Sequence, residues 1–159
     1  MSARNTIIIL LYLFCLNQTF PAKPDLIVAA DGSGDFVSIQ DALNAVPEGL
    51  TKRFIIFIKN GTYNEKLFIE KSNIAIVGED SGKTKIIFAE LRKNWQAKHP
   101  DDYGSAVINI KDSVTGILLS SLTIYNNYGN LYGDHDHAFA IRAGLGVTRI
   151  IFDNCKAYD

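Results

Sequence analysis

The sequence predicts an all-β fold of many short strands, preceded by a single short helix. Apolar runs rich in Val, Ile and Phe recur from residue 53 onwards. In several of them polar residues interleave at a period of two, which is the side-chain period of a β-strand. Turn-forming pairs such as Asn60-Gly61 and Ser81-Gly82 lie between the runs. No amphipathic helical pattern is found between residues 50 and 159.

The first expected elements are a short strand at residues 26–30, a glycine-rich turn at 31–35 and a helix. The turn lacks the spacing of a phosphate-binding loop, so we interpret it as a strand-to-helix connection. Ser38 can cap the helix, and Pro47 with Gly49 can end it. Four apolar residues fall on one face at helical spacing: Ile39, Ala42, Leu43 and Val46.

The remaining chain is divided into expected strands and one long loop. The expected strands are residues 53–59, 66–70, 74–79, 84–90, 106–111, 116–126, 137–143 and 148–155. The segment 91–105 is expected to project from the body as a loop, where binding groups are often found. Two architectures suit this pattern, an antiparallel sandwich or barrel and a solenoid of stacked coils. The pattern by itself leaves both open.

Charge gives little support for a nucleic-acid partner. The 159 residues include 16 basic and 17 acidic side chains, for a net charge of −1. A protein that holds a phosphate backbone needs a basic excess, which is absent here. An acidic polymer remains possible as a partner because local patches matter more than the sum.

The N-terminus is typical of a secretory signal peptide over residues 1–22, with cleavage near Ala22. Arg4 is followed by an apolar run at 7–16 that is short for a membrane span. A membrane anchor or a lipoprotein start at Cys15 is the alternative, but the residues before Cys15 are bulky. We therefore expect a secreted protein, extracellular or periplasmic. Its one remaining thiol, Cys155, is expected to be a buried structural residue.

Several motifs then occur in an order known from one family. They are the segments 28–47, 56–69, 74–87, 104–110, 122–127 and 137–143. In this order they resemble the start of the catalytic domain of pectinesterases, also called pectin methylesterases. The most specific motif is Gly61-x-Tyr63-x-Glu65. The resemblance implies a right-handed, single-stranded parallel β-helix with one short capping helix, of which residues 23–159 form the N-terminal part, truncated at the C-terminus.

Within that fold the motif around Tyr63 is expected to be structural. Asn60-Gly61 would turn the chain at a corner of a coil, where a positive φ costs Gly61 little. Tyr63 would place an aromatic ring against the neighbouring coil. Glu65 would accept hydrogen bonds that hold the turn.

The resemblance also implies a chemistry. Pectinesterases remove the methyl group from methyl-esterified galacturonate in pectin, that is, homogalacturonan. One Asp attacks the ester carbonyl, and a second Asp serves as acid and then as base. Gln amides stabilise the oxyanion, and an Arg orients the nucleophile. No metal or organic cofactor is implied, and the full-length protein is expected to be a monomer without a nucleic-acid or membrane partner.

This chain departs from the family pattern at its reactive groups. In the family, the two Asp and the Arg come later than the segment that ends here at Asp159, and Asp159 lacks the Thr that should follow it. We therefore expect a pectinesterase fragment without esterase activity of its own. The alternative hypotheses are a short protein that binds an acidic polysaccharide without hydrolysing it, and a purely structural β-helix segment.

Three residues match positions of the family's site, and Tyr128 is an aromatic candidate for sugar contact. His137 stands where an oxyanion Gln is usual; its ring could donate a hydrogen bond there, or it could only line the cleft. Ser105 and Ala106 match the small residues that line the substrate groove, and Tyr128 could stack on a sugar ring. His135 and His137 lack a third ligand, so no metal site is expected.

Overall fold

The strands form three parallel sheets. The computed structural model describes residues 23–159, and the predicted signal peptide lies outside the described residues. Sheet A contains β1 (Leu26–Val28), β2 (Phe54–Ile58), β5 (Ile74–Gly78), β8 (Thr115–Ser120) and β11 (Thr148–Asp153). Sheet B contains β3 (Gly61–Tyr63), β6 (Thr84–Phe88), β9 (Thr123–Asn126) and β12 (Lys156–Tyr158), and sheet C contains β4 (Leu67–Ile69), β7 (Ala106–Ile110) and β10 (Phe139–Ala143).

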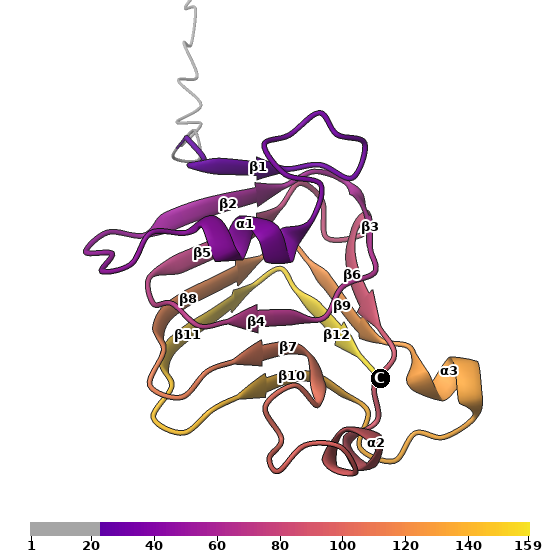
Figure 1. The fold of residues 1–159 in the computed structure, drawn as a ribbon. Helices are drawn as coiled ribbons and strands as arrows, with labels where there is room; N and C mark the ends of the chain where they lie inside the picture. The colour runs from indigo at the N-terminus through magenta and orange to yellow at the C-terminus, as the bar shows by residue number, and fades with distance from the viewer. Residues whose placement is uncertain (1–22) are drawn as a thin grey trace, which may run out of the picture.

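The chain visits the sheets in a fixed rotation. It runs from β2 to β3 to β4, then from β5 to β6 to β7, then from β8 to β9 to β10, and finally from β11 to β12 (Figure 1). Every pairing between neighbouring strands is parallel. Hairpins would give antiparallel pairs, so the sandwich or barrel is excluded. The predicted parallel β-helix is confirmed.

The interior of the β-helix consists of rows of stacked apolar side chains. In sheet A, Ile56 lies beside Ile76 and Ile76 beside Leu119, and all three are fully buried. In sheet C, Leu67 lies beside Ile108, which is also fully buried. Each coil thus covers the apolar surface of the next, which is how a solenoid obtains a continuous core.

The helix predicted near the N-terminus is confirmed as α1 (Ile39–Ala45). The Ser38 hydroxyl accepts a hydrogen bond from the backbone N–H of Asp41 at 3.2 Å, as expected for a capping residue. Ile39 and Leu43 are buried against the first coil, so α1 covers part of the core at this end of the β-helix (Figure 1).

The structure corrects the expectation that no helix follows residue 50. Two short helices occur, α2 (Arg92–Gln96) and α3 (Tyr128–Tyr132). Neither begins with a side-chain cap, since Leu91 and Asn127 make no capping hydrogen bond. Helices of one to two turns carry too few residues to display an amphipathic period, so sequence patterns do not reveal them.

Two expected strands are broken at a corner of the β-helix. The run 116–126 becomes β8 and β9, separated at Ser121 with a φ of 55°. The run 148–155 becomes β11, which ends before Asn154 with a φ of 49°. Positive φ at a single residue turns the chain between sheets without a glycine, a conformation that polar residues such as Asn adopt most readily.

The role predicted for Gly61 is wrong. Gly61 has no positive φ and instead begins β3. A side chain at this position would come within 3.3 Å of the Tyr63 ring. That ring is buried, and its hydroxyl donates to the carbonyl of Lys59 at 2.9 Å. Burial raises the pKa of Tyr63, which keeps the hydroxyl a donor. Glycine is therefore explained by close packing rather than by turn geometry.

The irregular spacing of strands in the sequence has a single cause. The connections from sheet B to sheet C are residues 64–66, 89–105 and 127–138, so their lengths differ strongly. The last two contain α2 and α3, and they lie beside each other at the N-terminal ends of the strands of sheet C (Figure 1). In the described part of the chain no helix is long and apolar enough to cross a membrane.

Candidate functional site

Two loops enclose the N-terminal ends of β7 and β10. The first loop is residues 89–105 and the second is residues 127–138. The backbone N–H of Arg92 donates to the carbonyl of His137 at 3.2 Å. The Asn94 amide donates to the Tyr128 hydroxyl at 2.8 Å. The two loops therefore form one connected rim above sheet C.

An ion pair adds to this connection between the loops. Lys93 lies 2.6 Å from Asp134, measured from Nζ to Oδ2. The hydrogen bond between them raises the pKa of Lys93 and lowers the pKa of Asp134. Both side chains are exposed to solvent, so the pair orients the loops more than it stabilises the fold.

A buried asparagine anchors the second loop to the first. Asn126 is fully buried, and its Nδ2 donates to the carbonyls of Glu90 at 2.7 Å and Phe139 at 3.0 Å. Its Oδ1 accepts from the backbone N–H groups of Glu90 at 3.2 Å and Tyr128 at 3.3 Å. One side chain thus holds the beginning of both loops and the start of β10.

A second buried asparagine holds the end of the first loop. Asn109 is fully buried within β7, and its Oδ1 accepts from the backbone N–H groups of Gly104 at 3.0 Å and Ala106 at 3.2 Å. Its Nδ2 donates to the carbonyls of Ala106 at 2.8 Å and Leu67 at 3.3 Å. Three of these hydrogen bonds fix the backbone on either side of Ser105, and the fourth ties Asn109 to β4.

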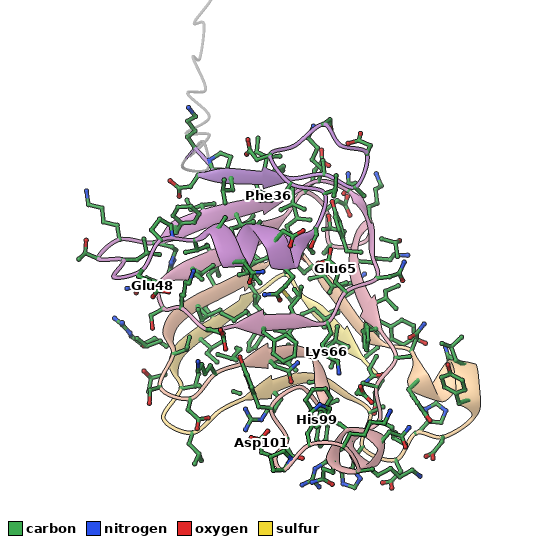
Figure 2. The ribbon with its side chains drawn as sticks, viewed as in Figure 1. Phe36, Glu48, Glu65, Lys66, His99 and Asp101 are labelled. Carbon is green, nitrogen blue, oxygen red and sulfur yellow. The ribbon has the colours of Figure 1, made fainter. Side chains whose placement is uncertain are left out.

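Two aromatic residues of the first loop form a cluster with Lys66. The Trp95 ring stacks on His99 with centroids 3.5 Å apart, and the Lys66 ammonium lies 4.1 Å from the Trp95 centroid. Lys66 also pairs with Glu90 at 2.8 Å, and the Trp95 indole N–H donates to the Asp101 carbonyl at 2.9 Å. Figure 2 labels Lys66, His99 and Asp101 on this side of the molecule. These contacts give the loop a rigid underside.

We expect Gly104→Ala to loosen this loop. Gly104 has a φ of +121°, and a Cβ there would overlap the Trp95 ring. Strain and displacement of the ring together should lower the free energy of unfolding by about 2 kcal/mol. Gly133→Ala is the matched control, because Gly133 has a φ of +70° but open space around it. Urea titration followed by Trp95 fluorescence should show a clearly smaller loss for Gly133→Ala; equal losses would contradict the packing argument.

The outer face of sheet C beside the first loop is hollowed. A cavity of about 300 Å³ is lined by Asp101, Tyr103, Lys111, Asp112 and Arg142. The Arg142 Nη1 atom is buried and has no hydrogen-bond partner among the described residues. The guanidinium carbon lies 5.6 Å from the centroid of the Tyr103 ring. Burial, and then the nearby Glu70 carboxylate, raise the pKa of Tyr103, so its hydroxyl stays protonated.

Another ion pair closes the loop upon itself. The Arg92 Nε and Nη2 donate to the two carboxylate oxygens of Asp102 at 3.0 and 2.9 Å, a bidentate geometry. The hydrogen bonds from Arg92 lower the pKa of Asp102 below its usual range. A lowered pKa in the folded state means that the contribution of this pair is present above the unfolded pKa. It is lost as the pH falls through the folded pKa.

The loop should therefore loosen in acid. We expect Trp95 fluorescence to change as the pH is lowered below about 4, the usual range for Asp. Trp95 is the single tryptophan, and its indole is bound to Asp101, next to Asp102. Asp102→Asn should show the changed fluorescence already at pH 7 and a smaller change on acidification. An unaltered acid transition in this variant would show that another group is responsible.

The four residues predicted from the sequence lie around this rim but differ in their exposure to solvent. Ser105 and Ala106 are fully buried, and the Ser105 hydroxyl donates to the Asp102 carbonyl at 2.8 Å. Tyr128 is partly buried and His137 is exposed. The His137 ring contacts the Asp136 carboxylate, and its backbone φ is 58°. Their predicted roles toward a substrate stay predictions.

A metal centre finds no support in the described residues. Across residues 23–159, no three His, Cys, Asp or Glu side chains are arranged to hold a metal ion.

Comparison with known proteins decides the family. A family model described as Pectinesterase matches residues 25–158. The chain belongs to the pectinesterase family. A pectinesterase of Petunia integrifolia is 51% identical over 143 residues, which are 89% of this chain and 35% of that protein. Pectinesterase 1 of Arabidopsis thaliana is 35% identical over 131 residues, which are 81% of this chain and 21% of that protein. The chain thus spans about a fifth to a third of these relatives.

Solved structures of pectin methylesterases share the fold. The carrot enzyme matches with a TM-score of 0.70 and 28% identity, covering 87% of this chain and 43% of that one. A pectin methylesterase variant in complex with a hexasaccharide matches with a TM-score of 0.72 and 26% identity, covering 87% of this chain and 46% of that one.

The residues that hold the pectinesterase rim were missed by the sequence analysis. Asn109 and Asn126 form the hydrogen-bond centres of the site, yet neither was selected. A signal was available for Asn109, which stands within an otherwise apolar strand run; Asn126 ends its run beside Asn127, so its signal is weaker. A polar side chain that is buried in such a run needs hydrogen-bond partners, so it is a candidate for holding nearby backbone in place.

Proposed function

We propose that this chain forms part of an enzyme that removes methyl esters from pectin. The observation that carries the proposal is the pectinesterase family match over residues 25–158. The substrate would lie along the outer face of sheet C, between the rim and the cavity near Arg142. The chain covers 35% of the petunia relative, so the proposal concerns the activity of a whole protein of this family.

The groups of this chain would position the polymer rather than break the ester. Arg142, whose Nη1 has no hydrogen-bond partner among the described residues, lines the cavity and can pair with a galacturonate carboxylate. Lys111 also lines the cavity but is paired with Glu70 at 3.3 Å. Tyr128 offers an aromatic ring at the rim for a sugar face. His137 can donate a hydrogen bond to the oxyanion, where relatives are expected to use Gln. Nucleophile, general acid and orienting Arg are expected from later segments.

Secretion is part of this proposal. Pectin is a polymer of the plant cell wall, so an enzyme acting on it has to leave the cell. The apolar run at residues 7–16 supports export. Detecting the protein in culture medium, with its N-terminus near Lys23, would test this.

A chimeric enzyme tests the proposed activity. Residues 25–158 would replace the matching segment of the petunia pectinesterase, and methanol release from methyl-esterified pectin would be measured. We expect the folded chimera to retain activity, because the cleft wall and rim come from a homologous segment. A folded chimera that releases no methanol would overturn the proposal. The 159-residue chain alone is expected to release none.

His137 can be examined in the same chimera. If its imidazole stabilises the oxyanion, His137→Ala should lower kcat by on the order of a hundredfold while His137→Gln retains most of it. His135→Ala, on the same loop, is the control and should leave kcat nearly unchanged. Equal activity of His137→Ala and the parent chimera would assign His137 to the cleft wall only.

A further inference from the structure

We propose that the outer face of sheet B binds a uronate-bearing oligosaccharide at a second site, apart from the cleft on sheet C. A groove of about 550 Å³ lies on this face. Its lining residues are Gly82, Lys85, Ile87, Thr123, Tyr125, Asn130, Lys156, Tyr158 and Asp159. The groove follows β6, β9 and β12, which are neighbouring strands of sheet B, and Asn130 of α3 also lines it.

Strand register places two lysines in one row across the groove. Lys85 of β6 lies beside Thr123 of β9, which lies beside Lys156 of β12. Neighbouring strands are about 4.8 Å apart, so the two lysines start roughly 10 Å apart on the same face. Both are exposed. Such a row can meet two negative charges on an extended polymer that crosses the strands.

These two ammonium groups are free to bind a ligand. Within residues 23–159, neither Lys85 nor Lys156 has a carboxylate or hydrogen-bond partner. Other lysines, such as Lys66 and Lys93, are instead held in ion pairs. Asp159 is the one acidic side chain in the lining, against the two lysines. Carboxylates are the complementary groups.

A second row supplies aromatic surface beside the charges. Ile87 lies beside Tyr125 in the register of β6 and β9, and Tyr125 lies beside Tyr158 in that of β9 and β12. The two tyrosine rings are perpendicular, with centroids 6.3 Å apart, and Tyr158 is half exposed. Aromatic faces pack against the C–H faces of sugar rings. Charge and aromatic surface together favour an acidic sugar over a phosphate or an acidic peptide.

The groove would hold the polymer outside the cleft. Its residues come from sheet B, whereas the cavity near Arg142 lies on sheet C. Such a site would keep demethylated polymer near the protein. The choice of galacturonate as the uronate rests on the proposed function. The argument from the charge and the aromatic surface of the groove is independent of that function.

The test is a titration of the ¹⁵N-labelled chain with de-esterified galacturonate hexamer, followed by NMR. Amide shifts are expected in β6, β9 and β12. Lys85→Gln/Lys156→Gln should weaken binding about tenfold, because two charge-assisted contacts are lost. Lys23→Gln/Lys52→Gln is the matched control, since it removes the same charge from exposed lysines outside the groove and should change the Kd less than twofold. A fully methyl-esterified hexamer should bind this groove more weakly than the acid.

The outcomes separate this site from the cleft. Shifts confined to sheet C, or equal Kd values for the two double variants, overturn the second site and leave the proposed activity standing. Shifts in sheet B that the groove variant abolishes support the second site, even if the chimeric enzyme proves inactive.

Discussion

Asn109→Ala is expected to lower the free energy of unfolding by about 3–4 kcal/mol, the largest effect that we predict. The substitution leaves two backbone N–H groups and two carbonyls without their partner in a fully buried place. Each unsatisfied buried group costs about 1–3 kcal/mol, moderated by relaxation of the loop. The end of the first loop, from Gly104 to Ala106, should therefore lose its fixed conformation.

Chemical denaturation and hydrogen exchange would measure this effect. Urea titration gives the loss of stability, and the amides of Gly104 and Ala106 should exchange much faster in the variant. Asn44→Ala is the control, because Asn44 is exposed on α1 and its side chain bonds only to Gln40 among the described residues. It should change stability by less than about 0.5 kcal/mol. Similar losses in both variants would rule out the special role of Asn109.

Glu65→Ala is expected to lower the free energy of unfolding by about 3 kcal/mol. The Glu65 carboxylate accepts hydrogen bonds from the backbone N–H groups of Ile39 at 3.0 Å and Gln40 at 2.9 Å, and from the Ser38 hydroxyl at 2.9 Å. Two of these donors are free N–H groups at the start of α1, where a negative charge is also favoured by the helix dipole. Without the carboxylate, α1 loses its attachment to the first coil.

Glu48→Ala is the matched control for this prediction. Figure 2 labels both residues, and Glu48 lies at the exposed end of the α1–β2 connection. Its ion pair with Lys71 is 3.6 Å long and 83% of the Glu48 side chain is exposed, so we expect a change below about 0.5 kcal/mol. Glu65→Gln keeps an acceptor and should fall between the two. Equal thermal unfolding midpoints for Glu65→Ala and Glu48→Ala would refute the role of Glu65 in attaching α1 to the first coil.

The outcome for Glu65 shows how far sequence reasoning reached. The motif around Tyr63 predicted a structural glutamate that accepts hydrogen bonds. The structure confirms that the Glu65 carboxylate accepts them. The expected partner was wrong, because the bonds go to Ile39 and Gln40 rather than to the turn at Asn60-Gly61. Partners 25 and 26 residues away in the chain depend on how coils stack, which local patterns do not encode.

In the candidate site, too, some residues were found from the sequence and others only from the structure. Resemblance selected Ser105, Ala106 and His137, whereas Tyr128 was selected for its aromatic ring. All four lie in or beside the two loops of the rim. The residues that hold the rim, Asn109 and Asn126, gave only a weak local signal. The positive groove on sheet B gave none, since Lys85 and Lys156 come together only through the register of a third strand between them.

By itself, the sequence determined the strand composition, the capped helix at Ser38 and the pectinesterase family. These features depend on side-chain periodicity, on local capping and on motif order, all of which are properties of neighbouring residues. Only the tertiary structure decided the strand breaks at Ser121 and Asn154, the two helices in the loops and the surfaces of sheets B and C. Those features arise from one coil packing on another, so their cause lies in contacts between residues that are distant along the chain.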